Sequence, residues 1–165
     1  MNLQQLNQMS HDQALDAFSR CCTASRWAEA MANRRPFASE EELFEAADAI
    51  WWDLDADDWL EAFAGHPRIG DIDSLREKYA STKSWSEDEQ SGVDSASEQV
   101  LQRLSQANDE YFDKFGYIFI VCATGKSAEE MLAILEERLP NDPDEEIQVA
   151  AGEQAKITKI RLEKL

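Results

Sequence analysis

The sequence predicts an all-α, single-domain helical bundle, because helix-start signals and helical spacing of apolar residues recur along most of its length. Four serines are each followed, three residues later, by a Glu or Gln, which is typical of a capping box at a helix N-terminus. Each pair is therefore expected to begin a helix. The pairs are Ser10 with Gln13, Ser39 with Glu42, Ser86 with Glu89, and Ser127 with Glu130.

Apolar residues after these signals alternate spacings of three and four, as on one face of a helix. Gly116 is expected to end one such helix, and residues 142–144, after Pro140, are expected to start the last one. The clearest sets are Leu43, Ala46, Ala47, Ile50 and Trp51, then Leu101, Leu104, Asn108, Tyr111 and Phe115, and in the last helix Ile147, Ala151, Ala155, Leu162 and Leu165.

A short segment near residues 117–123 departs from the helical pattern. It reads Tyr117-Ile118-Phe119-Ile120-Val121-Cys122-Ala123 and is rich in β-branched and aromatic residues. It is too short for a helix and is apolar on both alternating faces, so it is expected to be buried, extended chain.

The bulk composition favours one domain over residues 1–165. The chain is 165 residues long and 43% hydrophobic, which is enough apolar material for a full core. Its formal net charge of -18 argues against nucleic acid or an anionic membrane as a partner, because both would repel it.

The cysteines indicate a reduced, cytoplasmic protein. Cys21 and Cys22 are adjacent, and with Cys122 the three form no disulfide framework. The first residues lack the basic region and apolar run of a signal peptide, and no apolar run is long enough to span a bilayer. We therefore expect no export and no membrane insertion.

Two sequence matches to ligand-binding motifs fail on inspection. Residues 123–127 imitate a phosphate-binding loop, but the glycine required five positions before Gly125 is Ile120. The spacing of Asp53, Asp55 and Asp57 resembles a calcium loop, but the glycine and the final glutamate of that motif are absent. With two histidines and no ligand spacing among the cysteines, no metal site is expected.

His66 is the first candidate for catalysis. It stands in the run Gly65-His66-Pro67-Arg68-Ile69-Gly70, where proline restricts the backbone and glycine permits a close approach. Such a loop aims a side chain, and imidazole both gives and takes protons near neutral pH. The alternative is that His-Pro only marks a turn.

Three groups elsewhere in the chain are candidate partners of His66. Arg161 lies one helical turn from Ile157 and Leu165, so its guanidinium borders an apolar stripe where a carboxylate or a planar polar ligand would offset its charge. The alternative is that Arg161 snorkels or pairs with a spare carboxylate. Ser86 and Glu89 are the second candidate group, with the alternative that they only form a capping box. The backbone around Phe119 is the third candidate group.

Taken in order, four motifs closely resemble the OHCU decarboxylases of ureide metabolism, which act on 2-oxo-4-hydroxy-4-carboxy-5-ureidoimidazoline (OHCU), the last intermediate between urate and (S)-allantoin. The resemblance runs through nearly the whole chain. The motifs are His66-Pro67, the run Trp85-Ser86-Glu87-Asp88-Glu89-Gln90, residues 108–117 (Asn-Asp-Glu-Tyr-Phe-Asp-Lys-Phe-Gly-Tyr), and residues 156–162 (Lys-Ile-Thr-Lys-Ile-Arg-Leu).

The resemblance implies an all-helical enzyme with OHCU as its substrate. It implies that His66, Glu89 and Arg161 are catalytic. Many family members have Asp-Leu where this chain has Arg68-Ile69, and Pro where it has Ile118, which changes loop shape but removes no reactive group. The substrate pocket that the resemblance implies comprises Pro67, Ser86, Glu87, Asp88, Glu89, Gln90, Phe119, Ile120, Val121, Cys122, Ala123 and Arg161.

The implied chemistry needs no cofactor. The departing carboxylate is attached to a carbon beside an imine, so the substrate itself accepts the electron pair released with CO2. The protein then has to supply orientation, hydrogen bonds and one placed proton. We expect His66 to handle that proton, as a base toward the substrate hydroxyl or as an acid toward the intermediate.

Two other functions fit the residues. A non-enzymatic helical interaction module would use Trp27, Trp51, Trp52, Trp59 and Trp85 as an exposed aromatic surface, unless these tryptophans are core. A cofactor-free hydrolase or isomerase of a related ureide would use His66 and Glu89 as acid and base. For oligomeric state, the family resemblance and the tryptophan-rich early helices favour a homodimer.

Overall fold

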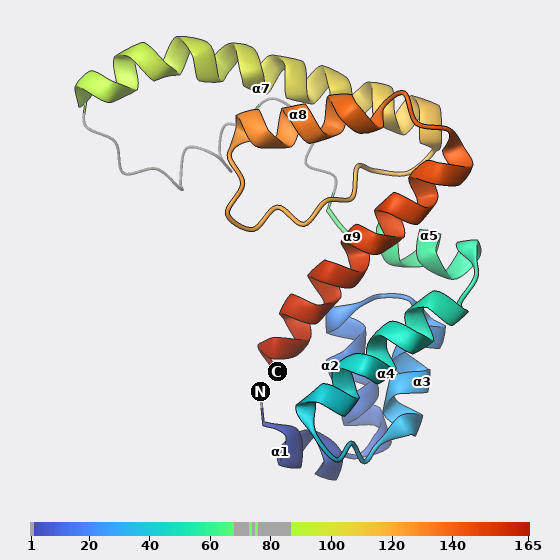
Figure 1. The fold of residues 1–165 in the computed structure, drawn as a ribbon. Coiled ribbons are helices and arrows are strands. Elements are labelled where there is room, and N and C mark those ends of the chain that lie inside the picture. The colour runs from blue at the N-terminus through green and yellow to red at the C-terminus, as the bar shows by residue number, and fades with distance from the viewer. Residues whose placement is uncertain (1, 68–72, 74, 76–86) are drawn as a thin grey trace. The chain divides into compact units, whose positions relative to one another are not determined.

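The structure is a computed structural model of residues 1–165, and it describes residues 2–67, 73, 75 and 87–165 (Figure 1). In the last of these ranges the side chains are described from residue 98 onward. The described residues are mostly helical and contain no β-strand, so the all-α prediction is confirmed. They divide into two compact units, whereas the prediction of a single domain over 1–165 remains a prediction.

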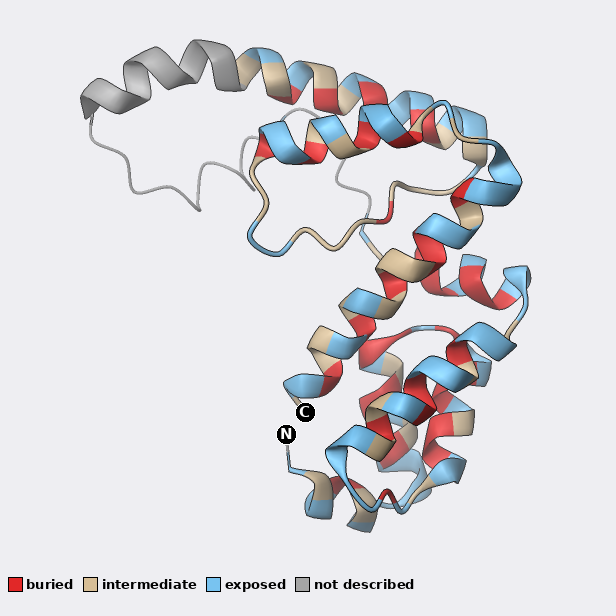
Figure 2. Cartoon of the chain, viewed as in Figure 1, coloured by how far each residue is buried: buried red, intermediate tan, exposed pale blue. Residues whose placement is uncertain are grey.

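The first unit contains residues 1–66, 120–122 and 147–165. Its core gathers apolar side chains from every helix of the unit, among them Leu6, Phe18, Trp27, Leu43, Phe63 and Leu162, each at most 1% exposed (Figure 2). The helices are α1 (Leu3–Gln8), α2 (His11–Cys21), α3 (Ser25–Arg34), α4 (Glu40–Asp53), α5 (Ala56–Ala64) and the part of α9 (Pro143–Glu163) from residue 147.

Tryptophans belong to this core, which argues against the interaction-module alternative. Trp27, Trp51 and Trp59 are buried, and only Trp52 is an exposed tryptophan among those described. The Trp51 indole N–H donates to the carbonyl oxygen of Ala151 at 2.9 Å, which joins α4 to α9. Since a buried indole N–H needs a partner, this bond fixes the register of the two helices.

The helix starts follow the predicted caps where the structure describes them. Ser10 and Gln13 form a complete capping box, and the hydroxyl groups of Ser39 and Ser127 each accept from the backbone N–H three residues later. Ser86 lies outside the described residues. A further capping box, which was not predicted because it begins with Asp instead of Ser, opens α5, where Asp55 accepts from the backbone N–H of the third residue of the helix.

The second unit contains residues 67–119 and 123–146. Its α7 (Glu87–Phe115) and α8 (Ala128–Arg138) lie side by side and bury Leu101, Leu104, Tyr111 and Leu135 (Figure 1). Gly116 follows α7 with a positive φ of 83°, a conformation that other residues rarely adopt, so the predicted end of this helix is confirmed.

Two predicted details need correction. Residues 117–123 are non-helical, as predicted, but only Ile120 is buried and the others are half-buried. The last helix begins as predicted, but its buried face is shifted: Ile147, Ala155 and Leu165 are half-buried. In the part of the helix that belongs to the first unit, two of the buried residues are polar, and their side chains hydrogen-bond one another. The buried face of this part comprises Ala150, Ala151, Gln154, Thr158 and Leu162.

Candidate active site

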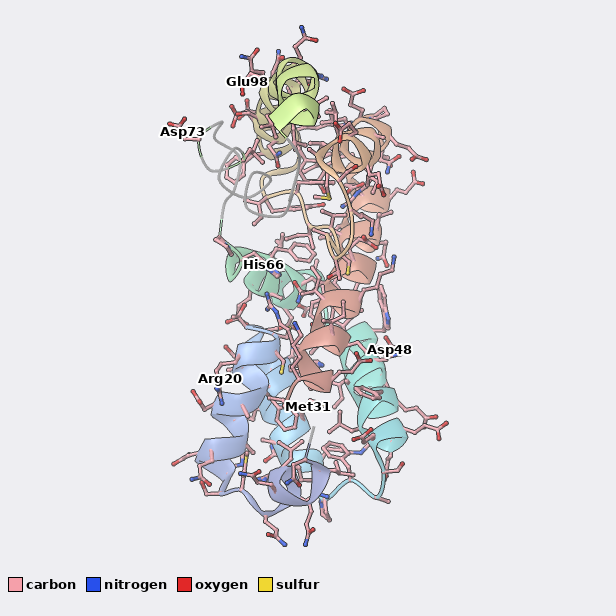
Figure 3. All side chains as sticks on the ribbon, turned by 90° about the vertical axis from the view of Figure 1, so that its left-hand side faces the viewer. Arg20, Met31, Asp48, His66, Asp73 and Glu98 are labelled. Carbon is pink, nitrogen blue, oxygen red and sulfur yellow. The ribbon has the colours of Figure 1, made fainter. Side chains whose placement is uncertain are left out.

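His66 stands directly after α5 in the first unit, with its backbone held in a tight turn (Figure 3). The backbone N–H groups of Gly65 and His66 donate to Ala62 and Phe63 carbonyls at 3.2 Å each. Gly65 has an ordinary helical conformation, so its flexibility is not what the turn requires. A Cβ there would lie 2.0 Å from Thr23 Oγ1, so glycine is needed for the close approach.

The imidazole of His66 contacts a buried amide. Its Nε2 lies 2.5 Å from Oε1 of Gln154 on α9, and Gln154 is 1% exposed. Behind this contact, Nε2 of Gln154 donates to Oγ1 of Thr158 at 3.0 Å, one turn further along the helix. The half-buried histidine is therefore anchored to the core by a chain of two polar side chains.

Cys22 is a buried thiol of the same unit and is 1% exposed. Burial raises the pKa of the Cys22 thiol to about 11, although the charge of Arg161 opposes this rise. Cys22 is therefore a neutral thiol near neutral pH.

Arg161 lies on the same helix as Gln154 and Thr158, and its charge acts on the imidazole. Its Nη1 donates to the backbone carbonyl of Cys21 at 3.3 Å, which ties the end of α2 to α9. The pKa of His66 is lowered from 6.5, first by burial and also by the positive charge of Arg161, while the bond to Gln154 opposes the shift. A lowered pKa leaves the imidazole neutral at pH 7, as a general base requires.

Part of the predicted pocket belongs to the same unit. Residues 120–122 are in the first unit, and the backbone N–H of Cys122 donates to the Glu153 carboxylate at 3.1 Å. Glu153 also accepts from Lys156 at 2.5 Å. One carboxylate of α9 thus holds the extended segment, next in sequence to Gln154.

Other predicted pocket residues belong to the second unit and are described there. Phe119 lies under the guanidinium of Arg138, at 4.7 Å from its ring centre, and its ring also meets Tyr111 at 5.4 Å. Ala123 is half-buried and Pro67 is exposed.

The Ser-Glu-Gln part of the predicted site remains a prediction. Ser86 lies outside the described residues. The backbone of the next four residues forms the first turn of α7, and their side chains are also outside the described part. These four are Glu87, Asp88, Glu89 and Gln90.

Gln154 and Thr158 are the site residues that sequence reasoning missed. They are not members of the apolar face predicted for the last helix, although their positions carry a signal. Gln154, Thr158 and Arg161 are spaced by four and three, so they share one helical face. A polar stripe at core spacing indicates a buried network, since buried polar groups need partners.

The described residues contain neither a metal-binding cluster nor a membrane-spanning helix. No group of three or more His, Cys, Asp or Glu side chains there is placed to hold a metal ion. Within the same part of the chain, every helix is too short or too polar to cross a membrane.

Comparisons with known proteins agree on one family. The family model for OHCU decarboxylase matches residues 7–163. The uric acid degradation bifunctional protein of Arabidopsis thaliana is 38% identical over 151 residues, which cover 91% of this chain and 46% of that protein. This chain therefore spans about half the length of the plant protein. The Xenopus laevis OHCU decarboxylase is 30% identical over 168 residues, covering 98% of this chain and 93% of that protein.

A solved structure supports the same assignment. A crystal structure of an OHCU decarboxylase in the presence of (S)-allantoin superposes with a TM-score of 0.72 at 37% identity, and the match covers 90% of this chain and 96% of that one. With a family model that matches nearly its whole length, the chain belongs to the OHCU decarboxylase family of carboxy-lyases.

Proposed function

We propose that this chain decarboxylates OHCU to (S)-allantoin in urate degradation, with His66 as the residue that handles the proton. The observation that carries the proposal is the contact of His66 with buried Gln154, beside the positive charge of Arg161. This arrangement holds a neutral imidazole in one orientation, in a chain that belongs to the OHCU decarboxylase family.

The proposed reaction needs no external electron acceptor. Loss of CO2 leaves its bonding electron pair on the substrate, where the adjacent imine accepts it and the imine nitrogen takes a proton from solvent. The resulting enol becomes the carbonyl of allantoin when its hydroxyl loses a proton and the neighbouring ring carbon gains one. Delivery of that last proton to one face of the ring produces a single enantiomer.

We assign the remaining residues to substrate binding. Arg161 presents a planar, permanently charged donor that suits the polar ring or the ureido group. Glu89 accepts from N–H groups of the substrate, with the backbone of residues 119–123 completing the clamp. The proposed lining also includes Pro67, Ser86, Glu87, Asp88 and Gln90.

The test is to supply freshly generated OHCU and to follow chiral allantoin by circular dichroism, against the slow racemic background reaction. We expect enantiopure product and release of CO2. His66→Asn, which keeps a polar side chain of similar reach, should fold normally and lose nearly all turnover. Product formed without CO2 release would replace the proposal with hydrolysis or isomerisation of a ureide.

Three further properties are part of the proposal. The activity is cofactor-independent, so it should survive dialysis against a chelator. The enzyme works in the cytoplasm, which suits its three cysteines, none of which is in a disulfide, and it acts as a homodimer. Light scattering of the purified chain tests the last point, because a monomeric mass across the working concentration range would contradict it.

A further inference from the structure

We propose that Gln154 is a positioning residue, which together with Thr158 holds His66 as the tautomer protonated on Nε2 and leaves Nδ1 as the atom that takes the substrate's proton. Only the identity of the substrate in this inference rests on the proposed function. The tautomer of the His66 ring can be measured without substrate.

The first step is the hydroxyl group of Thr158. Nε2 of Gln154 donates to Oγ1 of Thr158 at 3.0 Å, so the hydroxyl oxygen is the acceptor of this bond. Thr158 is only 6% exposed, so water does not compete freely for this oxygen.

The second step is the orientation of the Gln154 amide. Its two ends differ, since NH2 only donates and the carbonyl oxygen only accepts. With Oγ1 of Thr158 as an acceptor at 3.0 Å, the NH2 group has to face Thr158. The carbonyl oxygen therefore faces His66. The reverse orientation would set the NH2 group against the imidazole, and the carbonyl oxygen of Gln154 against Oγ1 of Thr158.

The third step is the imidazole itself. A carbonyl oxygen 2.5 Å from Nε2 requires a proton on Nε2. In the neutral ring the lone pair is then on Nδ1. Among the residues that the structure describes, the ring hydrogen-bonds through Nε2 alone, so Nδ1 faces no described partner.

The choice of a neutral amide has a chemical consequence. A carboxylate behind the imidazole would favour its charged form, whereas an amide oxygen accepts from Nε2–H in both protonation states. Among the described residues, Arg161 is the charged group that acts on the ring, and its positive charge disfavours the imidazolium form. His66 thus rests as a base. Nδ1 takes the proton of the enol hydroxyl and returns it to the neighbouring ring carbon, and Nε2–H stays on Gln154 throughout.

The experiment reads the tautomer directly. Long-range 1H–15N correlation spectra of the 15N-histidine-labelled protein, without substrate, distinguish a protonated Nε2 from a protonated Nδ1. We expect wild type to show Nε2–H and a bare Nδ1. Thr158→Val keeps the side-chain volume but frees the amide to rotate, so it should yield a mixture of tautomers.

Variants of Gln154 connect this state to catalysis. Gln154→Glu should raise the pKa of His66 and move the acid limb of the kcat profile upward in pH. Gln154→Met should lower kcat at least about tenfold with little change in KM, because Gln154 orients the base, His66, and does not bind the substrate. Gln148→Met is the matched control, since Gln148 is an exposed residue of the same helix and should behave as wild type.

The outcomes separate this inference from the proposed function. A bare Nε2 in wild type, or unchanged tautomer and kcat in both Gln154→Met and Thr158→Val, overturns the inference even if allantoin is produced. Failure of wild type to form allantoin overturns the proposed function, and the spectra of the labelled protein still decide the tautomer. If Gln154→Met does not fold, the nearly isosteric Gln154→Glu and Thr158→Val carry the test.

Discussion

Arg138 and Glu146 form an ion pair inside the second unit, with side chains 7% and 0% exposed. Nε of Arg138 donates to Glu146 Oε2 at 2.8 Å, and Tyr111 and Asn141 donate to the same carboxylate. The carboxylate is thus well provided with donors, which a buried charge requires. Because the guanidinium also lies over the Phe119 ring, the pair supports the start of the extended segment.

Glu146→Gln should destabilise the protein by about 3–5 kcal/mol, because it removes the buried carboxylate that pairs with the charge of Arg138. Urea unfolding measures the loss. The control is Arg103→Gln, which removes the exposed pairs with Glu110 and Glu136 and should cost about 1 kcal/mol or less. Equal effects of the two substitutions would contradict a special role for the buried pair.

Gly65 and Gly152 should respond oppositely to alanine. At Gly65 the new methyl would overlap Thr23, so Gly65→Ala should cost about 1–3 kcal/mol and reduce turnover by shifting His66. At Gly152, a helical position with nothing within 4 Å of the new atom, alanine should stabilise by up to about 1 kcal/mol. Thermal unfolding and steady-state kinetics of the two variants check both signs.

The sequence was sufficient for the helices because their signals are local. Ser10 caps a helix through a residue three positions away, and Gly116 ends one through its own φ. The site was harder to predict from the sequence, because Gln154 contacts a residue 88 positions away and the burial of Gln154 depends on packing. His66 and Arg161 were found since their chemistry is conspicuous. A buried glutamine has no such signature until its partners are placed.

Arg161 should tolerate neither loss of charge nor loss of shape. Arg161→Lys keeps the charge, so the pKa of His66 should stay lowered, but the planar donor is lost. We expect kcat/KM to fall about 10- to 100-fold, the value of a charge-assisted hydrogen bond of roughly 1.5–3 kcal/mol. Arg161→Gln should instead let the pKa of His66 rise, because the repelling charge is gone. NMR titration of His66 beside kinetics separates the two effects, and wild-type activity in Arg161→Lys would favour a snorkelling role.

The lowered pKa of His66 also makes stability depend on pH. Below pH 6.5 the histidine of the unfolded chain takes up a proton. The folded protein does not take up this proton until the pH reaches the lowered pKa of His66. The free energy of unfolding should therefore fall as the pH drops through this window, and it should be fully regained above 6.5. Urea unfolding at about pH 5.5 and about pH 7.5 measures this loss.

His66→Asn is the control for that loss, since it removes the titrating ring but leaves the carboxylates. The variant should lose less stability than wild type between the two pH values. An equal loss in both proteins would mean that His66 titrates alike in the folded and unfolded states.

The thiols should divide into one accessible and two protected groups. Cys21 and Cys22 are 2% and 1% exposed, and burial raises the pKa of each to about 11. At about pH 8 only roughly one in a thousand of these thiols is the reactive thiolate. Cys122 is half-buried and should react first with iodoacetamide in the folded protein, whereas all three should react in urea. Mass spectrometry locates the label, and Cys122→Ser should leave the folded protein nearly inert. Rapid labelling of Cys22 in the folded state would contradict its burial, because a thiol that is 1% exposed should not react before Cys122.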